Sequence, residues 1–231
     1  WLQAQHHARA GPYMIFEHTS LKPIPSPATR FWAPLLTALT VGIILRFYSL
    51  DREALWFDEA LTLVISQWDY SELWFMGVDP TPPLYYTLFK AFFSDSIPSV
   101  FNTRLLSVVF GILSIPVVYG IAATRFDRRS GVFAVALFSI SPIHIEYSQE
   151  ARAYSLAFFL VCVSAYCLTV LLASNRHADL SHPLACKRTS SWVFLYIVTA
   201  AASSYAHTIS IFWVAGSGLL LFYAFYRNQA P

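Results

Sequence analysis

The sequence predicts an all-α, polytopic transmembrane helix bundle. Of its 231 residues, 56% are hydrophobic and only 12% are charged, whereas an ordinary soluble domain carries roughly 25% charged residues. The apolar residues gather into runs of about 15–21, close to the roughly 20 that a helix needs to cross the hydrocarbon core. Short basic clusters separate these runs, so the net charge of +2 reflects membrane topology. Membrane lipids are expected as surroundings, and no nucleic-acid partner is expected.

Residues 1–30 are polar and proline-bearing, which predicts a flexible cytoplasmic tail. The chain begins with tryptophan, which makes Met14 a candidate start. Residues 31–226 are then expected to form one transmembrane domain, truncated at its C-terminus. Its first span is predicted over 31–50, and Arg46 lies close enough to the outer end to extend toward the interface.

A long acidic loop follows over residues 51–102 and holds eight of the thirteen acidic residues. Within it, residues 82–93 are apolar and aromatic but too short to cross the membrane, which predicts a helix lying at the interface. If this segment crossed, the basic cluster at 125–129 would lie outside, against the positive-inside rule. The loop is therefore expected on the extracytoplasmic face, with juxtamembrane helices of its own.

About six spans are expected in all. This arrangement places every basic cluster on the same, cytoplasmic side of the membrane. The polar segment 146–155 is predicted to be an external turn, in which Ser148 would cap the following helix. Together these features predict a multi-pass integral membrane protein. The five later spans are predicted over residues 105–124, 131–145, 153–173, 192–206 and 209–226.

This topology brings three polar motifs to one face: LWFDEA (55–60), YSQEARAY (147–154) and SYAH (204–207). Asp58 follows two bulky apolar residues, so its carboxylate would sit at the membrane surface and could accept a proton from an attacking hydroxyl or amine. The alternative is that Asp58 and Glu59 are a solvated or capping pair that opens a juxtamembrane helix. Adjacent helical residues point about 100° apart, so both cannot face one substrate atom.

Arg152 precedes a helix, and a helix N-terminus with one arginine can bind a phosphate. The alternative is an internal pairing of Arg152 with Glu150 or Glu146. His207 lies at a helical turn, where a capping or packing role is the more ordinary one. No metal-ligand spacing or glycine-rich phosphate loop is present in the sequence; the acidic loop could still hold a divalent metal ion, for which no ligand set is named.

The motifs WFDEA, PPLYY, SQEARAYSL and YAH, in this order, resemble the amino-terminal half of membrane glycosyltransferases with the C-type fold. The sequence is similar to bacterial proteins related to dolichyl-phosphate-mannose protein mannosyltransferases and lipid A aminoarabinose transferases, over residues 31–226. The resemblance implies transfer, with inversion, from a polyprenyl-phosphate sugar to a protein, lipid or glycan acceptor. It also implies a bacterial plasma (inner) membrane, with the active site on the extracytoplasmic face. Many such proteins carry histidine where Thr81 stands, so no role for that histidine is carried over.

The resemblance assigns the essential carboxylate to Asp58 and its neighbour to Glu59. Binding of the substrate and its lipid phosphate is assigned to a second group of residues, comprising Arg152, Glu150, Arg104, Tyr147 and His207. The alternative function is a non-catalytic membrane scaffold or lipid-carrier-binding subunit. A transporter is disfavoured because the acidic residues lie in a loop and the spans hold few charges.

Overall fold

The computed structural model describes residues 27–75, 81–93, 98–174 and 183–229, and the regular secondary structure within these ranges is all helix. The predicted tail lies almost wholly outside the described residues, and the first helix begins earlier than expected, at Pro27. The helices along the described chain are α1 (Pro27–Phe47), α2 (Phe57–Ser66), α3 (Tyr70–Phe75), α4 (Leu84–Phe92), α5 (Val100–Arg125), α6 (Arg128–Ser139), α7 (Pro142–Ser148), α8 (Tyr154–Ser174), α9 (Pro183–Ala206) and α10 (Ser210–Gln229).

The all-α prediction is confirmed for the described chain, but the count of six spans is not. Two stretches, Val100–Arg125 and Tyr154–Ala173, are long and apolar enough to cross a membrane. A third is counted if α6 and α7 together form one bent span. The stretches Trp32–Phe47 and Ser210–Ala224 are apolar but shorter. Six spans therefore stays a prediction.

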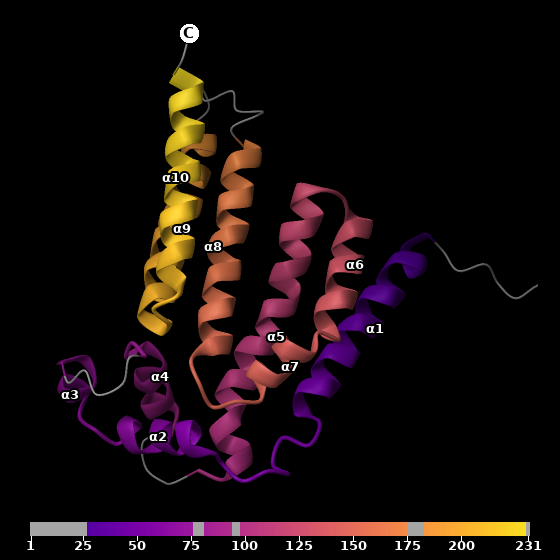
Figure 1. Cartoon of the computed structure of the whole chain (residues 1–231). Helices are drawn as coiled ribbons and strands as arrows, with labels where there is room; N and C mark the ends of the chain where they lie inside the picture. The colour runs from indigo at the N-terminus through magenta and orange to yellow at the C-terminus, as the bar shows by residue number, and fades with distance from the viewer. Residues whose placement is uncertain (1–26, 76–80, 94–97, 175–182, 230–231) are drawn as a thin grey trace, which may run out of the picture.

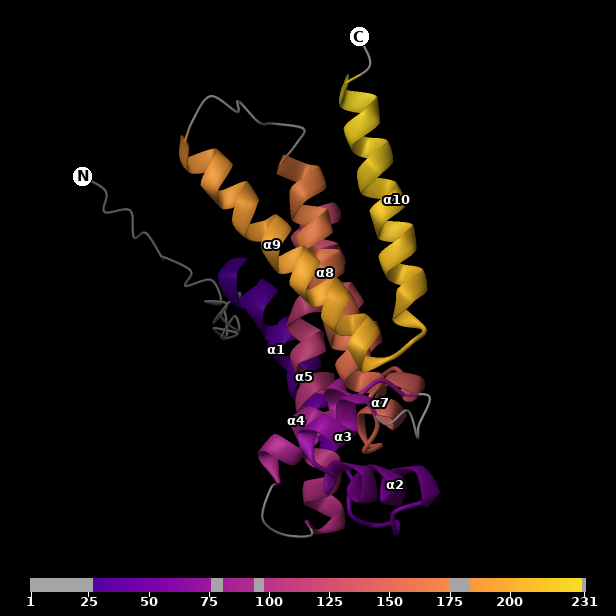
Figure 2. The same ribbon diagram turned by 90° about the vertical axis from the view of Figure 1, so that its left-hand side faces the viewer.

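The short helices gather at one end of the bundle. In Figure 1 the long helices run beside one another, while α2, α3 and α4 lie together at the bottom. Figure 2 shows the same grouping after a quarter turn. The turn between α5 and α6, which is flanked by Arg125, Arg128 and Arg129, lies at the opposite end. Which end faces the cytoplasm stays a prediction.

The predicted third span is broken in the middle. Helix α6 ends at Ser139, and α7 starts at Pro142 with a bend of 64°. Proline has no N–H to extend the preceding helix and its fixed φ suits the first turn of a new one, which accounts for the break. The predicted external turn is therefore partly helical. Ser148 ends α7, and its Oγ donates back to the carbonyl of His144 at 2.6 Å, so the prediction that Ser148 caps the next helix is wrong.

The expectation that Arg46 extends toward the interface is also wrong. Its side chain is 0% exposed, and Nη1 donates to the carbonyl of Gly42 at 2.8 Å. Nη2 donates to Nδ1 of His144 at 2.8 Å, and the guanidinium lies 5.5 Å from the centre of the Phe138 ring. The bend between α6 and α7 brings His144 beside α1, so this arginine finds its partners inside the bundle.

Helix α4 occupies the segment predicted to lie at the interface, and one of its faces packs into the bundle. Tyr85, Tyr86 and Phe89 are each at most 2% exposed. They share a core cluster with Leu106 of α5 and Leu156 of α8. This packing brings the acidic loop against the ends of two long helices.

Candidate active site

Glu59 and Arg104 form a buried ion pair that joins α2 to α5. Nε of Arg104 donates to Oε1 of Glu59 at 2.9 Å, and Nη2 donates to Oε2 at 2.7 Å. This is the two-bond geometry in which guanidinium and carboxylate bind most strongly. The Glu59 side chain is 0% exposed, so the carboxylate that we grouped with Asp58 faces the bundle and not the solvent.

The same two side chains also hold neighbouring backbone. The N–H of Ala151 donates to Oε1 of Glu59 at 2.9 Å. Nη1 of Arg104 donates to the carbonyl of Leu50 at 2.7 Å. A buried charged group needs its remaining hydrogen-bonding positions filled, and these backbone groups fill them. As a result, the start of the acidic loop and the connection between α7 and α8 are both bonded to the Glu59–Arg104 pair.

Asp58, one residue before Glu59, is exposed. Its position in the first turn of α2 turns its side chain away from the ion pair, as the angle between successive helical residues requires. Its backbone carbonyl accepts from Oγ1 of Thr62 at 3.1 Å and from Nη1 of Arg152 at 3.5 Å. Asp58 therefore combines a fixed backbone with an accessible carboxylate.

Arg152 reaches this place from the connection between α7 and α8, two residues before α8 begins at Tyr154. Its side chain is buried, and Nη1 donates to the hydroxyl of Tyr86 at 3.1 Å. Nη2 donates to Oγ1 of Thr81 at 3.1 Å. The WFDEA and SQEAR segments, far apart in sequence, are thus neighbours in the structure.

Two hydroxyl groups, joined by a hydrogen bond, hold the backbone carbonyl of Arg152. Oγ of Ser107 donates to the Arg152 carbonyl at 3.2 Å, and the Tyr85 hydroxyl lies 2.8 Å from Ser107 Oγ. Since Ser107 uses its own proton on the carbonyl, Tyr85 is the donor between the two hydroxyls. Burial raises the pKa of Tyr85, which keeps its phenol protonated and able to donate.

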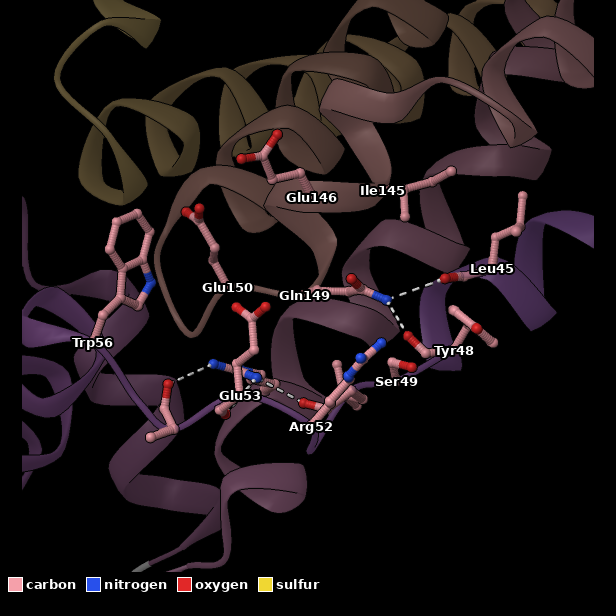
Figure 3. A pocket seen from close by; sticks show the side chains of 13 residues that line it. Leu45, Tyr48, Ser49, Arg52, Glu53, Trp56, Ile145, Glu146, Gln149 and Glu150 are labelled. Atoms are coloured by element: carbon pink, nitrogen blue, oxygen red, sulfur yellow. Dashed lines mark hydrogen bonds between the residues drawn. The ribbon is translucent and has the colours of Figure 1, made fainter.

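A polar cavity of about 550 Å³ lies between the end of α1, the acidic loop and α7. Figure 3 shows the carboxylates of Glu53, Glu146 and Glu150 around this space, with the Trp56 indole at one side and Arg52 at the other. The Trp56 side chain is 60% exposed, so an apolar ring face is available beside hydrogen-bonding groups. Cavities of this size with a few polar groups typically bind small molecules.

Glu150, which lines this cavity, has a raised pKa. Burial raises its pKa to about 7, the negative charges of Glu146, Glu59 and Asp58 act in the same direction, and Arg152 opposes them. The carboxyl group therefore exchanges a proton near neutral pH. Among the substrate and lipid-phosphate groups that we expected it to bind, a carboxyl surrounded by other carboxylates is better suited to a hydroxyl or an amine of the substrate than to a phosphate.

The side chain of Gln149 attaches the α7–α8 connection to the end of α1 by hydrogen bonds. Its Nε2 donates to the carbonyls of Leu45 at 3.1 Å, Arg46 at 3.2 Å and Tyr48 at 2.9 Å. The last carbonyls of a helix have no partner within the helix. One amide group thus satisfies them and holds the residue before Glu150 in place.

The structure separates Tyr147 and His207 from these residues. Both line a second, largely apolar cavity beside α8 and do not line the polar one. The His207 ring lies 5.4 Å from Tyr154, and its Nδ1 accepts from the N–H of Ile209 at 3.3 Å. The backbone contact agrees with the capping role that we weighed for His207.

For several residues of the site, no role was predicted from the sequence. Tyr85 and Tyr86 were read only as interface aromatics, although adjacent tyrosines on a short apolar helix present hydroxyls on two faces. Ser107 carried no recognisable signal within an apolar run. Within the described residues, no three His, Cys, Asp or Glu side chains are grouped so as to hold a metal ion.

Comparison with protein-family models finds a match to the family described as dolichyl-phosphate-mannose-protein mannosyltransferase, over residues 80–228. Arg104, Glu150 and Arg152 lie inside the matched region, whereas Asp58 and Glu59 precede it. Searches of curated proteins and of solved structures found no match.

Proposed function

The chain belongs to the dolichyl-phosphate-mannose-protein mannosyltransferase family of membrane glycosyltransferases, and on this premise we propose that it transfers a sugar from a polyprenyl-phosphate carrier to an extracytoplasmic acceptor with inversion. The observation that carries the proposal is the meeting of the exposed Asp58 with the buried guanidinium of Arg152, which donates to the Asp58 carbonyl at 3.5 Å. A base and a phosphate-binding cation are the two groups that this reaction needs.

In the proposed reaction Asp58 removes the proton from a hydroxyl or amine of the acceptor. The freed electron pair forms a bond to the anomeric carbon, while the bond from that carbon to the phosphate oxygen breaks. The carrier leaves as polyprenyl phosphate, whose growing negative charge Arg152 stabilises. A single displacement inverts the configuration at the anomeric carbon.

Glu59 and Arg104 receive a positioning role in this proposal. Their charged groups bind each other and are largely screened from solvent, although the Arg104 side chain also lines the polar cavity. By binding the Ala151 N–H, Glu59 holds the residue next to Arg152. The pair thus sets the separation between the α2 segment and the phosphate-binding side chain.

The polar cavity is the proposed place for a sugar. Trp56 supplies an apolar face for the ring, and the carboxylates of Glu53, Glu146 and Glu150 supply acceptors for hydroxyl groups. Glu150 lies close enough to Asp58 for the two charges to interact. Asp58 and Arg152 do not themselves line the cavity, so the anomeric carbon of a sugar held there would have to project toward them for transfer.

The test is transfer in vitro by the complete protein with a panel of labelled polyprenyl-phosphate sugars. Asp58→Asn should lower the rate on the order of 100- to 10,000-fold, as loss of a general base does. Asp51→Asn, which changes another exposed acid of the same loop outside the cavity lining, should leave the rate unchanged. Transfer that survives Asp58→Asn at full rate would refute the assignment, and absence of transfer with every donor would favour a non-catalytic, carrier-binding subunit.

A further inference from the structure

Helix α4 holds Arg152 from two directions. The Tyr86 hydroxyl accepts from Nη1 of the guanidinium at 3.1 Å. The preceding residue, Tyr85, reaches the main chain of the same arginine through Ser107 of α5, whose Oγ donates to the Arg152 carbonyl at 3.2 Å. Successive helical residues point about 100° apart, and the two tyrosine rings stand at 77° to each other. One helix of the acidic loop therefore holds both the side chain and the main chain of Arg152.

The main chain of Arg152 depends on such contacts because it lies outside a helix. Arg152 belongs to the connection between α7 and α8, two residues before α8 begins at Tyr154. On one side of it, the N–H of Ala151 donates to Oε1 of Glu59 at 2.9 Å. On the other side, Ser107 holds the Arg152 carbonyl. Loss of either bond would leave the peptide groups around Arg152 freer to rotate.

The hydroxyl of Ser107 bonds outside its own helix. A serine inside a helix often donates back to a carbonyl of the preceding turn, and Ser114, also on α5, does so to Phe110 at 2.8 Å. Ser107 instead donates to the carbonyl of Arg152. The Tyr85 hydroxyl, 2.8 Å from Ser107 Oγ, accounts for this choice. Its proton occupies one lone pair of the serine oxygen, which restricts the directions left to the O–H bond of the serine.

Both hydroxyl groups are shielded from water. Tyr85 and Ser107 are each 0% exposed. A rearrangement that separated them would leave a buried donor without an acceptor, which costs more than an ordinary hydrogen bond contributes. The bonds that run from Tyr85 to the Arg152 carbonyl therefore favour one arrangement of the α7–α8 connection over the others.

We propose that Tyr85 is a positioning residue of the transfer reaction and acts through Ser107 on Arg152. This role rests on the proposed function, in which Arg152 stabilises the charge that develops on the departing lipid phosphate. Such a group is most effective when it is already in place before the charge develops. Tyr85 is fully buried, so it touches no substrate, and its contribution is to fix the main chain from which the guanidinium extends.

A second tyrosine–serine pair of the described chain provides a matched control. The hydroxyls of Tyr196 and Ser217 lie 2.7 Å apart, and Ser217 Oγ donates to the carbonyl of Val214 in its own helix, α10, at 3.2 Å. Neither residue lines the polar cavity. Tyr196→Phe therefore removes the same hydroxyl from the same kind of buried pair, without a connection to Arg152.

The test is the kinetics of sugar transfer by the complete protein. Tyr85→Phe should lower kcat roughly 10- to 100-fold, because a displacement of about 1 Å at a reacting site has an effect of this order. The KM for the donor should change little, since the lost interaction is made chiefly in the transition state. Ser107→Ala should give the same result, whereas Tyr196→Phe should keep the kcat of the unaltered protein. Equal kcat values for Tyr85→Phe and Tyr196→Phe would overturn the proposal.

A double variant tests whether Tyr85 acts through Arg152. Once Arg152→Ala has removed the guanidinium, adding Tyr85→Phe should cause no further loss of kcat, because the group that it positions is gone. A further fall as large as that in the unaltered protein would show that Tyr85 acts by another route and would refute the positioning role.

Hydrogen exchange gives a result that needs no activity. The N–H of Ala151 is bonded to Glu59, and the N–H of Arg152 is bonded to the Glu150 carbonyl at 2.8 Å. Tyr85→Phe should speed exchange of these two amides roughly 2- to 10-fold, as expected for the loss of one hydrogen bond, and Tyr196→Phe should not. Unchanged exchange in Tyr85→Phe overturns this proposal alone. Absence of transfer by the unaltered protein with every donor overturns the proposed function, and with it any positioning for that reaction.

Discussion

Breaking the buried Glu59–Arg104 ion pair should lower the stability of the protein by an amount that can be calculated. In Glu59→Gln the side chain keeps its shape, but the amide places an uncharged group against a guanidinium whose side chain is only 9% exposed. Removing one partner of a buried ion pair typically costs about 3–5 kcal/mol, because the other charge stays buried without compensation. For chains of this length, roughly 2–4 °C of unfolding temperature is lost per kcal/mol. We therefore expect the unfolding temperature to fall by about 6–20 °C.

The assay is thermal unfolding of the purified protein in detergent, followed by tryptophan fluorescence at a fixed scan rate. Asp58→Asn is the matched control, because it removes the adjacent but exposed carboxylate and should leave the unfolding temperature unchanged. Arg104→Met should be as damaging as Glu59→Gln. The double variant should lose clearly less than the sum of the two, since no buried charge then remains. A small shift for Glu59→Gln, or strictly additive losses, would refute the reasoning.

Two further variants address acidity and packing. The pKa of Glu150 rises from its ordinary 4.5 to about 7. The stabilisation from its bound proton is therefore complete below about pH 4.5 and is lost as the pH rises through 7. The unfolding temperature should decline across this pH window, and Glu150→Gln should flatten the decline. If Glu150→Gln retains the full slope, other groups cause it. A Cβ at Gly111 would overlap the Ser148 side chain, so Gly111→Ala should cost about 1–3 kcal/mol despite the better helix propensity of alanine. Gly216→Ala, where a Cβ meets nothing within 4 Å, should be neutral or stabilising, and equal effects of the two would contradict the packing described.

The helical class could be predicted from the sequence because it depends on composition and on the length of apolar runs. Helix α8 was predicted to within a residue or two of its observed bounds, since little except apolar residues lies between 153 and 174. The break at Pro142 was not predicted, although the proline was visible. A proline can kink a helix, end it or start the next one, and tertiary packing decides among these outcomes.

The candidate site was anticipated at the level of segments and less well at the level of atoms. The sequence predicts that the WFDEA and SQEAR motifs share one end of the bundle, because charge and hydropathy constrain topology. It does not reveal which of two adjacent acids is buried, since that depends on the direction from which Arg104 approaches α2. Partners such as Tyr86 and Ser107 lie in apolar runs, where a single hydroxyl carries no pattern that distinguishes it from packing.

The attachment of Gln149 to the end of α1 has a consequence for motion. Because one side chain bridges three carbonyls there, the stretch leading to Arg152 is tied to the first helix. The same stretch is bonded to the acidic loop, since Glu59 accepts from the Ala151 N–H and Arg152 donates to the Tyr86 hydroxyl. Displacing either the first helix or the loop relative to Arg152 would therefore break a hydrogen bond of the site.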